Sequence, residues 1–242
     1  AKIIISGHSS GLGKALAELY LEQGCPVLGI ARRMLPPREG LQQCTLDLSD
    51  SGTLARWLES GAPEAFINGA DELVLINNAG TVAPSAVCGR QRPSEIAAAV
   101  ALNVAAPLML TNHVLAVRPE SLPVKIVHIS SGAGRKAYLG WSVYGATKAF
   151  VRQFSMNLRA ELADKNIRIT NIEPGLCGGT EFSNVRFKGD DERAEKVYEN
   201  VESIRPQDIA DTALWLYQRP AHMNVNSIEI MPVAQTFAGM KV

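Results

Sequence analysis

Short apolar runs alternate along the chain with longer segments of helical periodicity. Six runs rich in isoleucine, leucine and valine have the length of buried strands and cover residues 2–6, 26–31, 73–77, 124–130, 166–172 and 227–231, and a weaker one covers 43–46. The segments between them have patterns compatible with helices, over residues 11–23, 51–60, 94–117, 142–164 and 207–217. Strand and helix in repeated alternation predict an α/β fold with a doubly wound, parallel, seven-stranded sheet.

Nothing in the pattern divides the chain. It has no internal repeat, low-complexity tract or linker, and 242 residues of 46% hydrophobic composition suffice for one large core. We therefore expect residues 1–242 to form a single domain. The longest stretch without clear periodicity runs from Gly175 to Asp191, and long irregular loops are usually functional, so we expect a flexible substrate loop over about residues 176–200.

Charge and cysteine content restrict the class of partner. Lysine plus arginine equals aspartate plus glutamate at 24 each, so we expect a small-molecule partner, no nucleic acid and no membrane. The four cysteines form no close pair and the four histidines lie on different predicted elements, which predicts no disulfide framework and no metal site. The first apolar run is too short for a signal or a membrane span, and a reducing cytoplasm fits best.

The first predicted strand-to-helix turn is rich in glycine. Gly7, Gly11 and Gly13 have the spacing G-x-x-x-G-x-G, which lets a backbone approach a pyrophosphate while the helix N-terminus offers free N–H groups. The same spacing fits a plain connection, but its place after the first strand favours a phosphate cradle. The residues expected to line it are Gly7, His8, Ser9, Ser10, Gly11 and Leu12.

Arg32 and Arg33 follow the second predicted strand directly. In dinucleotide folds an acidic residue at this point holds the ribose 2′-hydroxyl, whereas an arginine accommodates a 2′-phosphate. The strand ends in Ala31 and lacks such an acid. Two loop arginines can also be merely solvated, but the missing carboxylate favours NADP (NADPH) as the cofactor.

Tyr144 and Lys148 lie one helical turn apart on one face of a predicted helix. A phenol with a pKa near 10 is a poor base at neutral pH, and a fixed cation beside it lowers that pKa, so the pair can transfer a proton. Ser131 closes a strand, where its hydroxyl could hydrogen-bond a reacting oxygen, and Asn103 is polar in an apolar helix. Each residue alone also fits a structural role in packing, capping or a satisfied core amide.

Together these residues resemble the short-chain dehydrogenases/reductases. The resemblance is carried in order and spacing over nearly the whole chain by Gly7, Gly11, Gly13, Asp47, Asn77-Asn78-Ala79-Gly80, Asn103, Ser131, Tyr144, Lys148 and Pro174-Gly175. It implies a Rossmann fold and an oxidoreductase. It also implies that Tyr144 is the catalytic acid or base, that Lys148 lowers the pKa of Tyr144 and binds the nicotinamide ribose, that Ser131 orients the substrate, and that Asn103 holds a water in a proton relay.

The resemblance implies further cofactor contacts. Asp47 and Leu48 are expected against the adenine, and Asn78, Ala79 and Gly80 near the adenosine ribose. Around the nicotinamide we expect Pro174, Gly175, Leu176, Gly179, Thr180 and Phe182. One departure from the family is that Thr180 falls six residues after Pro174 rather than the usual five, because a glycine pair lengthens the loop.

The lengthened loop resembles one branch of the family more closely, the enzymes that oxidise 3-hydroxy acids. This branch includes serine and allo-threonine dehydrogenases, 3-hydroxypropionate dehydrogenases and sulfoacetaldehyde reductases. The resemblance is dense from Gly145 to the C-terminus, whereas before Gly145 the chain matches only the broad family. A different ancestry of the two halves is therefore one hypothesis.

An acidic substrate needs a cation near the active site. Arg152, Arg186 and Lys188 are the candidates, although a contact with another helix or subunit explains Arg152 equally well. We expect Ser131, Tyr144, Arg152 and Arg186 to bind substrate. Glycines give the irregular loop hinge freedom and phenylalanines give it apolar cover, which predicts a lid that closes on cofactor binding.

These features predict an NADP-dependent oxidoreductase that interconverts a small 3-hydroxy acid, or a similar short polar alcohol, and its carbonyl. The alternatives are a carbonyl or pteridine reductase of neutral substrates and a non-catalytic NADP-binding redox sensor. The helix that carries Tyr144 has apolar and small residues around much of its circumference, and with the family resemblance this implies a homo-oligomer, a dimer or tetramer. The C-terminal tail from Val233 is expected near an active site.

Overall fold

Seven parallel strands form one sheet in the order β3-β2-β1-β4-β5-β6-β7, in a computed structural model that describes residues 1–236 and 239–240. The strands are β1 (Lys2–Ser6), β2 (Val27–Ala31), β3 (Leu41–Thr45), β4 (Leu73–Asn77), β5 (Val124–Ile129), β6 (Ile167–Pro174) and β7 (Ser227–Ile230). The chain crosses from β3 over to β4 on the other side of β1, which places a crevice at the carboxyl ends of β1 and β4. The predicted doubly wound α/β fold is confirmed.

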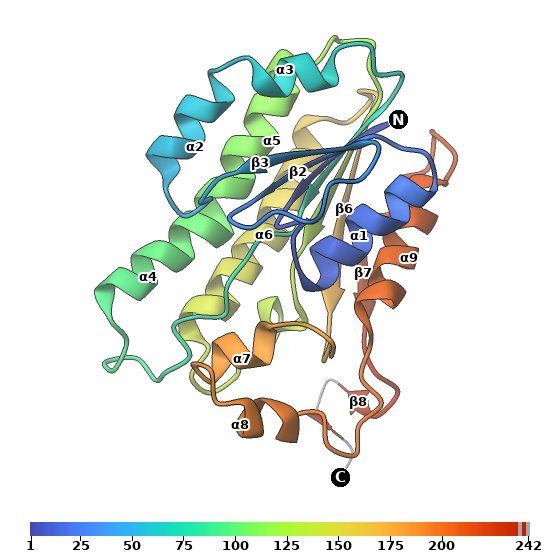
Figure 1. Ribbon diagram of the computed structural model, residues 1–242. Helices are drawn as coiled ribbons and strands as arrows, with labels where there is room; N and C mark the ends of the chain where they lie inside the picture. Colours follow the sequence, from blue (N-terminus) through green and yellow to red (C-terminus); the bar gives the residue numbers. More distant parts are fainter. Residues whose placement is uncertain (237–238, 241–242) are drawn as a thin grey trace.

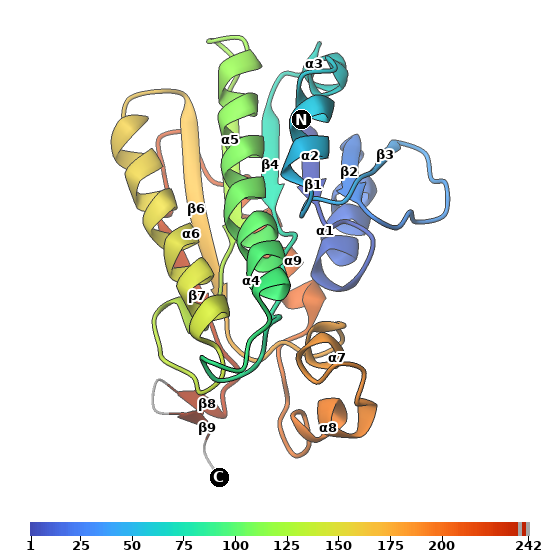
Figure 2. The ribbon, with the colours of Figure 1, turned by 90° about the vertical axis from the view of Figure 1, so that its left-hand side faces the viewer.

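Helices cover both faces of the sheet (Figures 1 and 2). On one face lie α1 (Gly11–Glu22) and α9 (Pro206–Tyr217). On the other face lie α2 (Ser51–Leu58), α3 (Ala62–Ile67), α5 (Ala106–Val117) and α6 (Ser142–Glu161). Because successive strand residues point to opposite faces, Ile3 and Ile5 of β1 pack with α1 and α9, whereas Ile4 joins the opposite core. Strands buried on both sides explain the continuous apolar runs in the sequence.

A long helical run crosses the second face. It consists of α4 (Pro93–Val100), a π-helical segment (Ala101–Ala105) and α5. By length and composition alone the run Pro93–Val117 could cross a membrane, and 33% of its most apolar window is buried. Ala106, Leu110 and Val114 of α5 belong to the core beneath it, so this run covers the sheet.

The predicted elements match the observed ones to within a few residues, with four additions. The loop expected to be irregular contains α7 (Phe182–Arg186) and is followed by α8 (Asp191–Lys196). Helix α3 was absent from the prediction, and a short antiparallel hairpin of β8 (Gln235–Thr236) and β9 (Gly239–Met240) forms near the C-terminus. Figure 1 shows α7, α8 and β8 together at the carboxyl edge of the sheet.

Candidate active site

The glycine turn joins β1 to α1 at the carboxyl edge. Gly7 has a φ of 74° and Gly11 a φ of 49°, a region that side chains rarely enter, and a Cβ on Gly13 would overlap the Gly7 carbonyl oxygen. Within the described part of the chain, the Ser10 side chain makes no capping hydrogen bond to the first turn of α1, and that turn contains no acid. Its N–H groups therefore remain available to an anion, as a pyrophosphate requires.

The end of β4 holds this turn in place. Ser6 Oγ accepts hydrogen bonds from the main-chain nitrogens of Asn78 and Ala79, each at 3.0 Å. Asn78 Nδ2 in turn donates to the carbonyl oxygens of Ser6 at 3.0 Å and Gly7 at 3.2 Å. The predicted cofactor residues Asn78 and Ala79 thus brace the cradle, and Gly80 beside them lies next to the Lys148 ammonium, which a Cβ would approach to 3.5 Å.

Three predicted cofactor residues have their side chains engaged elsewhere. His8 is fully buried with its Nε2 2.8 Å from Gln43 Oε1, in space that a Cβ on Gly29 would fill, so only its main chain lines the cradle. The Leu48 side chain is buried in the core. Asp47 accepts hydrogen bonds from the hydroxyl and the main-chain nitrogen of Ser49, which lower its pKa.

Tyr144 lies at the start of α6, and its side chain is 5% exposed. Burial raises its pKa to about 12, and a hydrogen bond with Ser131 opposes that rise. Ser131 caps a short 3-10 turn (Gly132–Gly134) after β5, where its Oγ accepts from the Ala133 nitrogen at 3.1 Å. Because that oxygen accepts from the backbone, the Ser131 hydroxyl can donate its proton to the Tyr144 oxygen or to a reacting oxygen beside it.

Lys148 lies one turn along α6 from Tyr144. Its Nζ donates to the Ile129 carbonyl oxygen at 2.7 Å and lies 5.8 Å from the centroid of the Tyr144 ring. Burial lowers the pKa of Lys148 to about 8. The resemblance implied that Lys148 lowers the pKa of Tyr144; in this structure burial raises that pKa, and the Lys148 ammonium donates to the Ile129 carbonyl oxygen.

Asn103 lies in the π-helical segment, fully enclosed beneath the loop after β4. Its Nδ2 donates to the Thr81 carbonyl oxygen at 2.8 Å and to Thr147 Oγ1 at 3.0 Å, and its Oδ1 accepts from the Thr81 nitrogen at 2.8 Å. Thr147 Oγ1 donates to the Tyr144 carbonyl oxygen at 2.8 Å. The Asn103 amide thus connects the π-helical segment to the helix that carries Tyr144. Such π-helical turns occur frequently at functional sites.

An aromatic wall borders the phenol of Tyr144. The Trp141 ring lies 5.3 Å and the Phe182 ring 5.6 Å from the Tyr144 ring, centroid to centroid. The Arg186 guanidinium stacks 4.8 Å over Trp141, and among the residues that the structure describes Arg186 forms no ion pair. Partial burial lowers the pKa of Arg186. The sequence offered no sign of Trp141, because its contacts depend on the fold.

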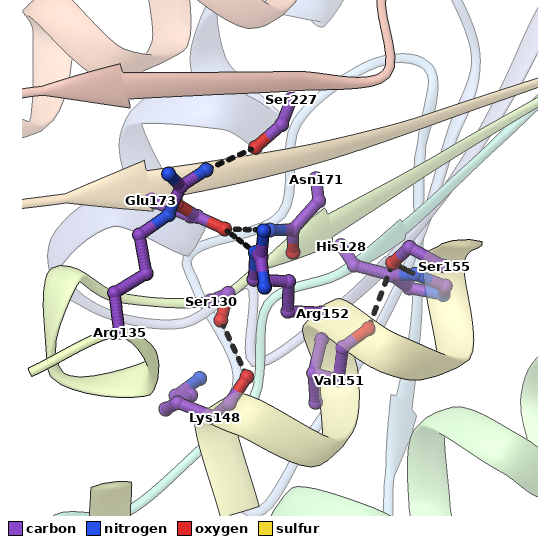
Figure 3. A network of polar contacts seen from close by, with 10 residues as sticks. All are labelled: His128, Ser130, Arg135, Lys148, Val151, Arg152, Ser155, Asn171, Glu173 and Ser227. Carbon is purple, nitrogen blue, oxygen red and sulfur yellow. Dashed lines mark hydrogen bonds and ion pairs between the residues drawn. The ribbon is translucent and has the colours of Figure 1, made fainter.

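The other two candidate substrate cations are already paired. Arg152 Nε lies 3.4 Å from Glu173 Oε1, and Lys188 Nζ lies 3.7 Å from Glu95 Oε1. Glu173 is fully buried, and it also binds Arg135 and accepts from Asn171 Nδ2 at 2.6 Å, as Figure 3 shows. Of the three predicted cations, Arg186 is therefore the one that lies against the aromatic wall beside Tyr144 and has no ion pair among the described residues.

The loop after β6 closes over the glycine turn. A Cβ on Gly11 would lie 3.2 Å from Thr180 Cγ2, and Gly179 has a φ of 66°. The C-terminal tail contacts the loop after β6. Gln235 Oε1 accepts a hydrogen bond from the Leu176 nitrogen at 2.8 Å and fills the space beside Gly175. The expected approach of the tail to the site is found in residues 233–236; residues 237–238 and 241–242 lie outside the described residues.

Glu181 is a residue of this loop that the sequence prediction missed. Arg33 donates to it through Nη1 at 2.9 Å and Nη2 at 2.6 Å, although the two residues are 148 positions apart. Arg33 lies beside Arg32 at the end of β2, where the 2′-phosphate was predicted. Only the folded chain brings these groups together, so local sequence patterns contain no signal for the contact.

Comparisons with known proteins agree on one family. Residues 1–191 match the family model of the short chain dehydrogenases. A probable NADP-dependent dehydrogenase of Haemophilus influenzae is 42% identical over 247 residues, which cover 99% of this chain and 96% of that protein. The NADP-dependent 3-hydroxy acid dehydrogenase YdfG of Escherichia coli is 37% identical over 250 residues, which cover 99% of this chain and 98% of that protein.

A solved structure matches the fold closely. The closed form of serine dehydrogenase complexed with NADP+ superposes with a TM-score of 0.90 at 37% identity, over 100% of this chain and 99% of that chain. Single relatives thus align with both halves of the chain, which argues against a different ancestry of the halves.

Proposed function

This chain belongs to the short-chain dehydrogenase family, and on that premise we propose that it interconverts a small 3-hydroxy acid and its carbonyl compound by hydride transfer with NADP. One observation carries the proposal. The buried phenol of Tyr144 is hydrogen-bonded to Ser131 and bordered by the Trp141 ring, over which Arg186 lies, and Lys148 follows one turn later.

The residues at the carboxyl edge fit NADP. The positive φ angles of Gly7 and Gly11 and the open N-terminus of α1 suit a pyrophosphate, and Arg32 and Arg33 suit a 2′-phosphate. When bound, the nicotinamide ring supplies the acceptor or donor of the hydride. The other contacts inferred from the family resemblance, among them Asp47, Leu48, Gly80, Pro174 and Thr180, are part of the same proposal.

Tyr144 moves the proton. In oxidation its phenolate accepts the proton of the substrate hydroxyl, and in reduction its phenol donates a proton to the carbonyl oxygen. Because burial holds the pKa of the phenol at about 12, the phenolate needs a positive charge nearby. Lys148, with a pKa of about 8, is mainly protonated at neutral pH and provides that charge, while the Ser131 hydroxyl donates to the reacting oxygen.

Asn103 positions the loop after β4 and α6 through its hydrogen bonds to Thr81 and Thr147. Both of its amide N–H groups are used in these contacts. We place the water of the proton relay close to this residue, where Lys148 and the π-segment meet, so that the proton taken by Tyr144 can reach solvent.

Arg186 binds the acidic group of the substrate. Its guanidinium is held over Trp141, and its charge is free for a carboxylate or a sulfonate, both of which suit a bidentate fork. Sulfoacetaldehyde is therefore a further candidate substrate beside 3-hydroxy acids. Arg152 has a buried carboxylate of the chain as its partner, so we assign it a structural role.

The test measures NADPH absorbance with NADP or NAD and a panel of serine, 3-hydroxypropionate, 3-hydroxybutyrate, sulfoacetaldehyde and neutral carbonyls. We expect activity with acidic substrates and NADP, and a loss of roughly a thousandfold in kcat for Tyr144→Phe. Arg186→Ala should raise KM about tenfold or more for acidic substrates and little for neutral ones. The matched control Arg193→Ala removes a guanidinium that stacks on Phe187 in the same part of the chain.

Other results would point to other functions. Turnover of neutral carbonyls alone, with no effect of Arg186→Ala, would identify a reductase of neutral substrates. NADPH binding without any turnover, unchanged in Tyr144→Phe, would identify a redox sensor.

We further propose that residues 1–242 act as one domain with a flexible substrate loop over about residues 176–200. The four free cysteines suit a reducing cytoplasm, and the apolar helix faces suit a homo-oligomer, a dimer or a tetramer.

A further inference from the structure

A carboxylate of the chain itself occupies the predicted 2′-phosphate site. Glu181 Oε1 and Oε2 accept from the two terminal nitrogens of Arg33 at 2.9 and 2.6 Å, a bidentate arrangement. The hydrogen bonds from Arg33 lower the pKa of the Glu181 carboxyl. A hydrogen bond from the Ser10 hydroxyl and the nearby charge of Arg32 lower it further. Glu181 is therefore charged at neutral pH.

These are the donors that a ribose 2′-phosphate needs. A phosphate oxygen and a carboxylate oxygen have the same preference for a guanidinium fork, and a fork that holds one cannot hold the other in the same geometry. Two anions at one cation also repel each other. A cofactor that carries the 2′-phosphate must therefore displace Glu181 from Arg33, whereas a cofactor with a 2′-hydroxyl can leave the ion pair intact.

The position of Glu181 in the loop couples this exchange to the rest of the site. Thr180 lies against Gly11 of the phosphate cradle, and Phe182 lies against the ring of Tyr144. Release of the Glu181 side chain from Arg33 therefore removes a tie between this loop and the end of β2. The link at Arg33 thus connects recognition of the 2′-phosphate to the loop that covers the reacting groups.

We propose that Glu181 is a specificity-determining residue, an internal competitor for the 2′-phosphate whose release from Arg33 accompanies binding of NADP but not of NAD. This proposal rests on the proposed function, because it needs Arg33 to be a 2′-phosphate site. The ion pair is exposed, with side-chain exposures of 61% and 56%, so the competition is weak and its effect on affinity modest.

The experiment measures dissociation constants by calorimetry for adenosine 2′,5′-bisphosphate and for AMP, which differ by the 2′-phosphate alone. Glu181→Gln should bind the bisphosphate roughly two- to fivefold more tightly than the wild type and AMP with unchanged affinity. Asp191→Asn, a neutralised carboxylate of the same loop that interacts with Asn184, is the matched control for a general charge effect and should change neither. In an Arg33→Met background, Glu181→Gln should have no effect.

The outcomes separate the two proposals. If Arg33→Met weakens the bisphosphate selectively but Glu181→Gln changes nothing, or changes both ligands equally, the competitor role is wrong and the NADP site stands. A gain from Glu181→Gln that persists without Arg33 also overturns the competitor role. If the wild type does not prefer the bisphosphate over AMP, and Arg33→Met has no effect, the proposed use of NADP itself fails and the competitor role fails with it.

Discussion

Lys148 shows at the scale of one residue that the site is built at a cost to stability. Lys148 is 6% exposed, and burial lowers its pKa from 10.5 to about 8. That difference corresponds to roughly 3 kcal/mol of destabilisation wherever the lysine is charged in both the folded and the unfolded state. The hydrogen bond to the Ile129 carbonyl offsets part of it.

We therefore predict that Lys148→Met abolishes catalysis and stabilises the fold at pH 7 by about 1–2 kcal/mol. The folded pKa lies below the unfolded one, so between pH 8 and 10.5 the unfolded state binds more protons and the wild type gains stability as pH rises. Between pH 7 and 10 the stability of the variant relative to the wild type should fall by about 2–3 kcal/mol, so that the variant is the less stable protein at pH 10. Urea denaturation at both pH values measures this.

The exposed Lys165→Met variant is the control, and its stability relative to the wild type should stay nearly constant over the same pH range. An advantage of Lys148→Met that is absent at pH 7, or equal at both pH values, would contradict the assigned burial effect.

At the scale of elements, the sequence predicted what depends on local pattern and missed what depends on distant partners. Strands β1, β2, β4, β5 and β6 were predicted because they are apolar runs buried on both faces, whereas the partly exposed β3 gave only a weak signal. The long helices were predicted because their apolar positions recur. Helices α7 and α8 have five and six residues, too few for a period to register. The Asp190 side chain caps α8 by accepting a hydrogen bond from the Arg193 nitrogen. An aspartate at this position is a sequence signal for a helix start, but a single residue does not predict a six-residue helix.

The candidate site divides in the same way. Gly7, Ser131, Tyr144 and Lys148 were predicted because family motifs have fixed spacing, and the strand ends bring them to one edge of the sheet. The Glu181 contact with Arg33 could not be predicted, since it needs the loop after β6 to lie across the end of β2. A single sequence contains no periodic or motif signal for such a contact.

Glu173 links three parts of the site, namely β6, the turn after Ser131 and α6, as Figure 3 shows. It ends β6 beside Pro174, and it binds Arg135, which follows the turn of Ser131, and Arg152 on α6. Its carboxylate is fully buried, whereas both arginines reach solvent in part. One buried carboxylate thus connects the three segments that carry or flank the catalytic residues.

We predict that Glu173→Ala costs about 2–3 kcal/mol of unfolding free energy, because it leaves a cavity at a fully buried position and takes the acceptor from Asn171, while the partly exposed Arg135 and Arg152 lose their common partner. Glu173→Gln should cost less, since its amide oxygen still accepts a hydrogen bond. Thermal and urea unfolding measure the losses. The control is the exposed Glu161→Ala at the end of α6, expected within about 0.5 kcal/mol of the wild type. Equal losses for Glu173→Ala and Glu161→Ala would show that the network does not hold the elements together.

At the scale of the whole molecule, one side of the protein leaves apolar side chains of its helices exposed. In the most apolar window of Pro93–Val117, 33% of the residues are buried, and Val100 at the end of α4 is 44% exposed. Helix α6 lies next to α4 and exposes Met156 to 52%. Exposed apolar side chains on two neighbouring helices favour a protein interface, and a second copy of the chain with two-fold symmetry would cover them with the same helices.

The final prediction follows from that face. Wild-type protein should have a mass in solution of at least twice the 26.1 kDa of one chain. Met156→Glu or Val100→Glu should lower that mass, because a carboxylate buried without a partner opposes association. Light scattering on a sizing column at micromolar concentration measures the mass. Met223→Glu, an exposed methionine after α9, is the control and should leave the mass unchanged. Because α6 also carries Tyr144 and Lys148, dissociation of the subunits should lower kcat as well. A wild-type monomer, or variants with the wild-type mass, would show that these helix faces remain open to solvent.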